Sequence, residues 1–231
     1  MDLFRISRSL AEYLDRMEFG LPVTHVYNPL TYAWDNFHEY LTRFGRGPKD
    51  VLIMGMNPGP WGMAQTGIPF GEITFVRDWL GLNHPVGQPA NAHPQRPVVG
   101  MACARSEMSG LKVWSWVKSR FGTPDAFSTA HLIINYCPLA FFEADGTNRT
   151  PDKLQKKERE LLFASCDLAL RQTVQCLRPR LIVGLGRFAE QRIAASLTGI
   201  TVQQRMVPHP SPANPRSRTG WEVAMDQAVR L

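Results

Sequence analysis

Short runs of apolar residues alternate along the chain with longer segments in which apolar residues recur every three or four positions. The apolar runs cover residues 51–54, 131–139 and 181–187. A run that is apolar on both faces is typical of a strand buried in a parallel sheet, because helices cover both sides of such a sheet. We therefore interpret these runs as strands.

Segments with the helical period lie before, between and after the strands. They predict helices over residues 5–17, 32–44, 74–80, 109–120, 151–177, 188–197 and 220–229. Ser7 or Ser9 is a candidate N-cap of the first helix, and Thr150 with Pro151 forms an N-cap and N1 pair for the longest. Alternating helices and strands are typical of a parallel α/β sheet. Since no repeat or linker divides the sequence, we expect one domain over residues 1–231.

The loop after the first strand, residues 55–71, is rich in glycine and proline. Glycine permits backbone conformations that are closed to other residues, whereas proline fixes φ and removes a hydrogen-bond donor. The loop is therefore stiff, and it follows the carboxyl end of a strand, where open α/β sheets bind ligands. A plain surface connection is the alternative, but long loops in compact domains are usually functional.

Two later segments also combine a strand end with special residues. Asn135 interrupts the second apolar run, and a buried amide without partners costs about 1–3 kcal/mol, so Asn135 must be paired internally or serve a ligand. Residues 206–216 surround His209 with four prolines. Because parallel strands end at one edge of a sheet, we expect Asn57, Asn135 and His209 to converge there.

Composition narrows the classes of protein and of ligand. The chain has 231 residues, 44% of them apolar, and carries a net charge of +6, which favours an anionic partner such as nucleic acid. It has neither an apolar run of membrane-spanning length nor a signal-peptide pattern, so we expect an intracellular protein without membrane association. Its four cysteines include no C-x-x-C pair and no histidine at ligand spacing, and we expect neither a metal nor a cofactor. Arginines gather around the last two loops: Arg187, Arg205, Arg216 and Arg218.

Residues 55–71 closely resemble the first motif of the single-strand-selective monofunctional uracil-DNA glycosylases. Residues 209–215 are similar to the second motif of that family, and residues 135–139 to its pyrimidine-reading segment. The similarity continues through residues 76–81, 106–110 and 220–222. The resemblance implies the three-layer α/β/α fold of the uracil-DNA glycosylase superfamily. It also implies excision of uracil, and of some 5-substituted or oxidised uracils, to leave an abasic site.

The resemblance assigns roles to individual residues. Asn57 would position a water, and His209 would donate a hydrogen bond toward uracil O2. Asn135 would read the base, on which Phe70 would stack. The remaining substrate residues would be Met56, through its backbone, and Gly59 and Met63, beside C5 of the base.

The resemblance also implies base flipping from single- and double-stranded DNA by a monomer. Residues 210–216 resemble the family's wedge, and vertebrate members carry arginine where this chain has Ala213. The expected DNA contacts are Gly186, Arg187, Ser211, Pro212, Ala213, Asn214, Pro215 and Arg216. With no lysine in the motifs, we expect no lyase step. Two alternatives stay open: a glycosylase for deaminated purines, and a non-catalytic DNA-binding module on the same fold.

Overall fold

A four-stranded parallel sheet forms the centre of the protein, whose computed structural model describes residues 2–230. Its strands are β2 (Val51–Gly55), β3 (His131–Asn135), β6 (Leu181–Leu185) and β7 (Gln203–Val207), in the spatial order β3-β2-β6-β7. The register pairs Gly55 with Asn135 and Met54 with Gly184. The carboxyl ends of all these strands therefore lie at one edge of the sheet.

The two middle strands are buried, as their apolar sequences predict. Leu52, Ile53 and Val183 have no exposed surface. β7 is an edge strand, and its residues before Val207 are exposed or half-buried. Its two glutamines suit that position, and they also explain why β7 does not stand out as an apolar run in the sequence.

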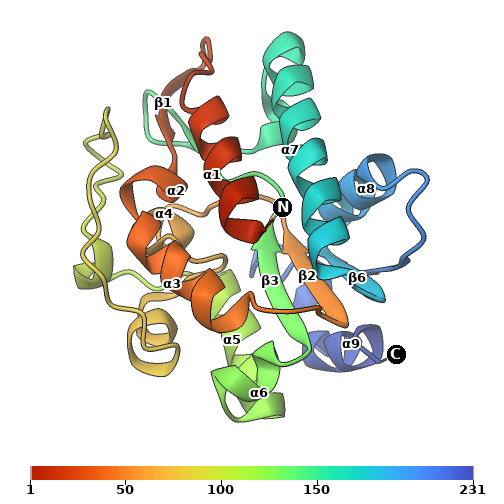
Figure 1. Ribbon diagram of the computed structural model, residues 1–231. Helices are drawn as coiled ribbons and strands as arrows, with labels where there is room; N and C mark the ends of the chain where they lie inside the picture. The colour runs from red at the N-terminus through yellow and green to blue at the C-terminus, as the bar shows by residue number, and fades with distance from the viewer. Residues whose placement is uncertain (1, 231) are drawn as a thin grey trace.

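Helices pack around the sheet (Figure 1). In that view α1 and α7 lie side by side in front of the strands, while α8 and α9 pack on β6 and β7. The helices are α1 (Leu3–Leu14), α2 (Pro29–Tyr32), α3 (Trp34–Phe44), α4 (Met63–Thr66), α5 (Met108–Phe121), α6 (Pro124–Ser128), α7 (Lys156–Leu177), α8 (Arg187–Ser196) and α9 (Trp221–Ala228). Within residues 2–230, none of them is both long and apolar enough to cross a membrane. The arrangement confirms the predicted α/β fold with a central parallel sheet.

A second, smaller sheet is antiparallel. Its strands are β1 (Val23–Tyr27), β4 (Ala140–Glu143) and β5 (Asn148–Arg149), in the order β1-β4-β5. The predicted strand 131–139 ends at Asn135, and β4 begins a few residues later, after Pro138. One apolar stretch of sequence therefore contributes to two different sheets.

The predicted start of the long helix is wrong. Residues Pro151–Lys153 form a separate 3-10 turn, and α7 begins at Lys156 after the N-cap Gln155. The Thr150 side chain makes no capping hydrogen bond. Proline fits the first turn of either kind of helix, so the Thr150–Pro151 pair marks a helical start without giving its length.

Three smaller predictions need correction. The side chain of Asp2, rather than that of Ser7 or Ser9, caps α1 by accepting a hydrogen bond from the Arg5 N–H at 2.8 Å. The short helix predicted over residues 74–80 is a π-helix, Phe75–Trp79. The single helix predicted over residues 32–44 is two helices, because α2 ends at Tyr32 and α3 begins at Trp34.

Candidate active site

A cavity of about 390 Å³ opens at the carboxyl edge of the parallel sheet. It brings together every residue predicted to act in catalysis or base binding: Met56, Asn57, Gly59, Met63, Phe70, Asn135 and His209. The second-motif residue Ser211 also lines it. Lining residues that the sequence did not predict are Pro58, Pro60, Glu107, Ser109, Asn148 and Thr150. Asn148 belongs to β5 and Thr150 follows that strand, so the small antiparallel sheet supplies part of the wall.

Asn57 lies two residues beyond the end of β2 and has a fixed amide. Its Nδ2 donates a hydrogen bond to the backbone carbonyl of Leu139 at 3.0 Å. Since the amide nitrogen is engaged, the amide oxygen is the group left to accept a hydrogen bond inside the cavity. A water held by this oxygen would present a lone pair to a bound substrate.

Asn135, the last residue of β3, lines the cavity and has an unsatisfied amide oxygen. Its Nδ2 lies 3.2 Å from the sulfur of Met63, which is a weak acceptor. Its Oδ1 is buried and has no hydrogen-bond partner among the described residues. An unsatisfied buried acceptor is costly, so this oxygen is a strong indication that a ligand N–H binds here.

Phe70 faces the same space from a strained backbone. Its φ of 55° lies in the left-handed region, where side chains other than glycine are uncommon. The Phe70 carbonyl accepts hydrogen bonds from Trp114 Nε1 at 3.1 Å and from the Glu72 N–H at 2.7 Å. A β-carbon at Gly110 would lie 2.0 Å from the same carbonyl oxygen. The start of α5 therefore approaches closely enough to hold Phe70 in this conformation.

Gly55 allows Asn135 and Phe70 to approach each other across the end of β2. A β-carbon at Gly55 would lie 2.5 Å from Asn135 Oδ1 and 2.5 Å from the Phe70 ring. The first residue of the motif is thus required for a close approach at the base-binding wall. The glycine-rich composition of the loop indicated such an approach but not its position.

His209 follows β7, and its hydrogen bonds define its tautomer. Its Nδ1 accepts the backbone N–H of Ser211 at 3.2 Å, so in the neutral ring the proton is on Nε2. Burial lowers the pKa of His209 below its usual 6.5. The loop carbonyl of His209 also accepts from Asn214 Nδ2 at 3.0 Å. The ring is therefore a neutral donor with a fixed direction.

The remaining predicted DNA contacts surround His209 without lining the cavity. A β-carbon at Gly186 would lie 3.1 Å from His209 Cβ, so Gly186 and the start of α8 pack directly against the histidine loop. Pro212 borders a neighbouring surface hollow together with Lys112 and Arg218. Their contacts with DNA, and those of Arg187, Ala213, Asn214, Pro215 and Arg216, stay predictions.

One arginine predicted to gather near these loops points elsewhere. The Arg205 guanidinium donates to backbone carbonyls at the C-terminal end of α9, including that of Ala228 at 2.9 Å. Cations stabilise helix C-termini, where carbonyl groups lack partners. Arg205 is therefore engaged in closing a helix.

Glu107 is a cavity residue that the sequence did not single out. Its carboxylate caps α5 by accepting from the N–H groups of Ser109 at 3.2 Å and Gly110 at 2.6 Å. Burial raises the pKa of its carboxyl, and the backbone hydrogen bonds act in the opposite direction. A β-carbon at Gly59 would meet the Glu107 side chain first, at 3.7 Å. Glu107 therefore bounds the space beside Gly59.

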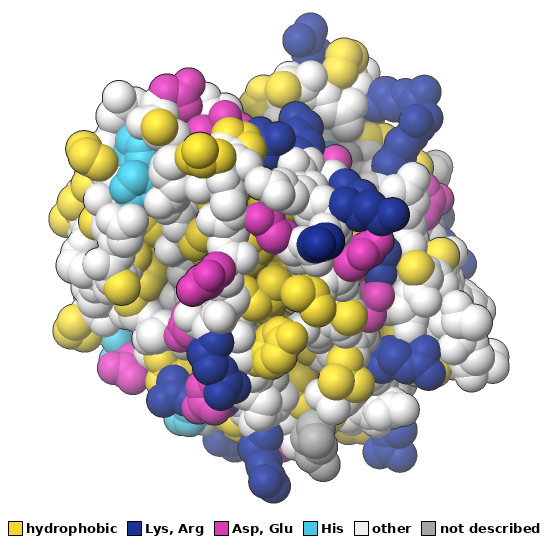
Figure 2. Space-filling view, turned by 90° about the horizontal axis from the view of Figure 1, so that it is seen from above, with side chains coloured by type: hydrophobic (Ala, Val, Ile, Leu, Met, Phe, Trp, Pro, Cys, Tyr) yellow, Lys and Arg dark blue, Asp and Glu magenta, His cyan; other side chains and the backbone are white. Residues whose placement is uncertain are grey.

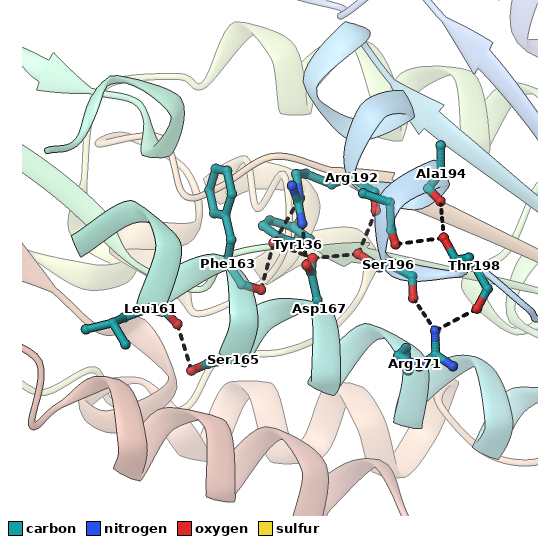
Figure 3. Close-up of polar contacts among 11 residues, drawn as sticks. Tyr136, Leu161, Phe163, Ser165, Asp167, Arg171, Arg192, Ala194, Ser196 and Thr198 are labelled. Atoms are coloured by element: carbon teal, nitrogen blue, oxygen red, sulfur yellow. Dashed lines mark hydrogen bonds and ion pairs between the residues drawn. The ribbon is translucent and has the colours of Figure 1, made fainter. Parts of the chain in front are cut away.

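The strand end that carries Asn135 is tied to two helices by its neighbour Tyr136 (Figure 3). The Tyr136 hydroxyl donates to Asp167 of α7 at 2.6 Å, and Arg192 of α8 forms an ion pair with the same carboxylate. Ser196 donates to Asp167 as well, at 2.6 Å. This network joins α7, α8 and the end of β3 behind the cavity.

The residues present suit hydrolysis by oriented water and neutral hydrogen-bond donors. Among residues 2–230, no group of three or more histidine, cysteine, aspartate or glutamate side chains is placed to hold a metal ion. The cavity combines an aromatic face, Phe70, with the amide of Asn135 and its unsatisfied oxygen. A flat heterocycle with an N–H beside a carbonyl oxygen matches that pair.

Comparisons with known proteins identify the family of the chain. Residues 43–227 match the model of the uracil DNA glycosylase superfamily. The chain is 48% identical over 219 residues to the single-strand selective monofunctional uracil DNA glycosylase of Mus musculus, covering 94% of this chain and 78% of that protein. It is 47% identical over 222 residues to the protein of the same name from Bos taurus, covering 95% and 82%.

A solved structure supports the fold. The crystal structure of SMUG2 from Pedobacter heparinus superimposes with a TM-score of 0.64 at 17% identity, covering 96% of this chain and 92% of the other. Such a low identity compares folds and not substrates. The fold, the cavity and the extent of the sequence identity together show that this chain belongs to the single-strand selective monofunctional uracil-DNA glycosylases of the uracil-DNA glycosylase superfamily.

Proposed function

We propose that the protein hydrolyses the N-glycosidic bond of uracil in DNA and leaves an abasic site. The observation that carries the proposal is the unsatisfied Oδ1 of Asn135 beside Phe70 in the cavity. Uracil offers N3–H to this oxygen and O4 to the neighbouring Nδ2, whereas cytosine presents the opposite pair. Family membership at 48% identity supports the same substrate.

The chemical step uses a water and two oriented side chains. A water held by Asn57 Oδ1 attacks C1′ as the bond from C1′ to N1 breaks, and the bonding electrons leave with the pyrimidine. His209 Nε2–H stabilises the resulting anion at O2, and losing one such donor typically costs about 10²–10³ in rate. The amide of Asn57 cannot accept the proton of the water, which passes to solvent.

Hydrolysis without a lyase step follows from the residues at hand. A Schiff base with the sugar needs an amine, and none of the cavity's lining residues within 2–230 is a lysine. The products are then free uracil and an intact strand with an abasic site. Alkali-dependent strand cleavage, absent without alkali, is the expected result on a gel.

The target nucleotide must leave the base stack to reach the cavity, at a cost of a few kcal/mol on duplex DNA. We infer that the protein acts on single- and double-stranded DNA and that single strands, which need less unstacking, react faster. We also propose that the protein acts as a monomer, because a single chain supplies Asn57, Asn135 and His209 to the cavity.

A panel of oligonucleotides, each with one lesion, tests the proposal. Uracil should be released, while hypoxanthine and xanthine should not, because a purine presents different groups to Asn135. Asn57→Ala should bind the same DNA and release no base. Release of deaminated purines alone would establish the purine glycosylase instead, and no release of any base by the wild type would favour a DNA-binding module.

The range of substituents at C5 is tested at Gly59. A β-carbon there meets only Glu107, at ordinary contact distance, so the small residue leaves the space beside C5 open. We expect Gly59→Tyr to lose activity on 5-hydroxymethyluracil before it loses activity on uracil. Equal losses on both substrates would show that the tyrosine blocks the whole cavity.

A further inference from the structure

Two arginines and a tryptophan lie together beside segments that line the cavity, at a place that we call its rim. Trp61 directly follows the lining residue Pro60, and Arg105 lies two positions before the lining residue Glu107. The guanidinium carbon of Arg105 lies 4.4 Å from the centre of the Trp61 ring, and that of Arg96 lies 5.2 Å from it. We refer to Arg96 and Arg105 as the arginine pair.

The charge of the arginine pair is not neutralised by a carboxylate within residues 2–230. Among these residues, neither guanidinium forms an ion pair, whereas other arginines, such as Arg120 and Arg149, each contact a carboxylate. Two cations beside one ring repel each other, and an exposed cation–π contact returns only about 0.5–1 kcal/mol. An anion bound between or beside them would relieve this repulsion.

The structure holds the pair in place without neutralising it. Buried Gln65 donates from Nε2 to the carbonyls of Pro60 at 2.9 Å and Pro97 at 3.0 Å, and its Oε1 accepts the Val99 N–H at 2.9 Å. This one side chain joins the loop of Trp61 to the loop of Arg96. The site is therefore preformed at the cavity rim.

Hydrogen bonds fix Arg96 while leaving its charge available. Its Nε donates to the Gly146 carbonyl at 2.7 Å, and its own carbonyl accepts from the Tyr27 hydroxyl at 2.7 Å. Among residues 2–230, the two terminal nitrogens of Arg96 and the whole guanidinium of exposed Arg105 form no hydrogen bond or ion pair. Planar guanidinium groups match the geometry of phosphate oxygens.

We infer that the arginine pair on Trp61 binds the phosphodiester backbone of the DNA strand on one flank of the flipped nucleotide. The inference rests on the proposed function, since it takes DNA as the ligand of the adjoining cavity. His209 and Ser211, which begin the loop expected to act as the wedge, line the same cavity as Pro60 and Glu107. A strand that enters the cavity would then meet the arginine pair in addition to the wedge loop.

Basic side chains are scattered over the face shown in Figure 2, with acidic side chains between them. A strand attracted only by net charge would find no defined path on a surface of this kind. A preformed pair of unneutralised arginines at the cavity rim provides one fixed point.

The salt dependence of binding tests the inference. The ligand is a single-stranded oligonucleotide with a tetrahydrofuran abasic analogue, which the wild-type protein binds without reaction. We expect the double variant Arg96→Gln with Arg105→Gln to bind this oligonucleotide about tenfold more weakly than the wild type in low salt. We also expect its slope of log K against log [salt] to flatten by about 0.7 for each phosphate that it no longer neutralises. The matched control is Arg46→Gln, an exposed arginine beyond α3 and before the amino end of β2, which should change neither quantity.

Shortened oligonucleotides locate the flank. If the arginine pair binds the backbone, removing nucleotides on one side of the analogue should lower the affinity of the wild type until it equals that of the double variant. Shortening the other side should preserve the difference between the two affinities. An unchanged salt slope in the double variant, with the same melting temperature as the wild type, would overturn the inference. Because the assay measures binding, its failure is distinguishable from a failure of uracil release by the wild type, which would overturn the proposed function.

Discussion

The Asn57 side chain donates a hydrogen bond to the backbone, and this bond determines how replacing Asn57 with a carboxylate would change the rate. Nδ2 donates to the Leu139 carbonyl at 3.0 Å, whereas an ionised aspartate has no hydrogen to donate. A general base typically contributes about 10²–10⁴-fold to a rate. We nevertheless expect Asn57→Asp to be slower than the wild type by about tenfold or more near neutral pH, because two oxygens would face each other without a hydrogen between them.

Single-turnover release of uracil from a saturating oligonucleotide measures this effect. Asn57→Ala is the matched control, since it removes the water-orienting oxygen together with the donor. An Asn57→Asp enzyme faster than the wild type would show that the Leu139 segment adapts and that a base alone limits the rate.

His209 is expected to act as a neutral donor, and the pH profile tests its protonation state. Burial holds its pKa below 6.5, and a ring protonated on Nδ1 could no longer accept the Ser211 N–H. We expect the single-turnover rate to be constant through neutral pH and to fall only as the pH drops below 6.5 toward the lowered pKa. His209→Asn, which keeps an amide donor but does not titrate, should be slower and lack this acidic decline.

The same lowered pKa has a consequence for stability. Below 6.5 the unfolded histidine binds a proton that the folded one does not, so the free energy of unfolding falls as the pH drops from there toward the lowered pKa. Above pH 6.5 the histidine is neutral in both the folded and the unfolded protein, and His209 contributes no pH dependence to the free energy of unfolding.

The kinetic prediction has its own contrary outcome. A single-turnover rate that rose on acidification would contradict a neutral His209 donor.

Residues to which the motifs assign a role could be predicted from the sequence, whereas the others that border the cavity could not. Asn57, Asn135 and His209 are polar residues at strand ends, and the structure brings them to one cavity. Glu107 carries no such mark, because its position depends on how α5 approaches the loop of Gly59. Thr150 resembles a helix cap in the sequence and lines the cavity in the structure.

At the scale of elements, the close packing at the end of β2 depends on Gly55 having no side chain. We expect Gly55→Ala to fold, because the change lies at the strand's last residue, but to lose about 10²-fold in kcat/KM on uracil, as a 1 Å displacement of a positioning group can cost. The physical reason is the clash of the new β-carbon with Asn135 Oδ1 and the Phe70 ring, both 2.5 Å away.

A second glycine in the same loop gives the control. A β-carbon at Gly59 would meet only the Glu107 side chain, at 3.7 Å, so Gly59→Ala should keep most of the activity on uracil. Melting temperatures of both variants show whether each is folded. Equal activities in the two alanine variants would contradict this expectation. They would mean that Asn135 and Phe70 can move away from the new β-carbon without loss of activity.

Elements with an apolar or periodic sequence of their own were predictable, and elements without one were not. β2, β6, α1 and α9 follow patterns that depend on few neighbours. The antiparallel strands β1, β4 and β5 gain their identity by pairing with each other, which no local pattern records. The polar edge strand β7 is a strand because β6 offers it a hydrogen-bonding partner.

At the scale of the whole molecule, one carboxylate joins elements that are far apart in sequence. Asp167 on α7 receives the Tyr136 hydroxyl, the Ser196 hydroxyl and the Arg192 ion pair (Figure 3). Burial raises the pKa of Tyr136 well above its usual range. The network connects α7 and α8 to the residue that follows Asn135, so it stabilises the fold, aligns the base-reading amide, or does both.

The backbone favours a stabilising role over an aligning one. The Tyr136 N–H donates to the Gly55 carbonyl at 3.0 Å, and the Cys137 N–H donates to that of Met56 at 2.9 Å, so the end of β3 is held without the hydroxyl. We expect Tyr136→Phe to lower the free energy of unfolding by about 1.5–3 kcal/mol, a value typical of a hydrogen bond to a charged partner. We expect kcat/KM on uracil to change less than about twofold, well under the effect of one hydrogen bond on a rate.

Urea denaturation and single-turnover kinetics on the same preparations separate the two roles. Ser165→Ala removes an exposed hydroxyl of α7, bonded only to the Leu161 carbonyl one turn away, and should change neither quantity. If Tyr136→Phe instead kept its stability and lost activity, the hydroxyl would have to act on Asn135 through the strand. In that case the loss should appear on uracil and 5-hydroxymethyluracil alike, because both present the same N3–H and O4 to Asn135, whereas a change at Gly59 separates the two substrates.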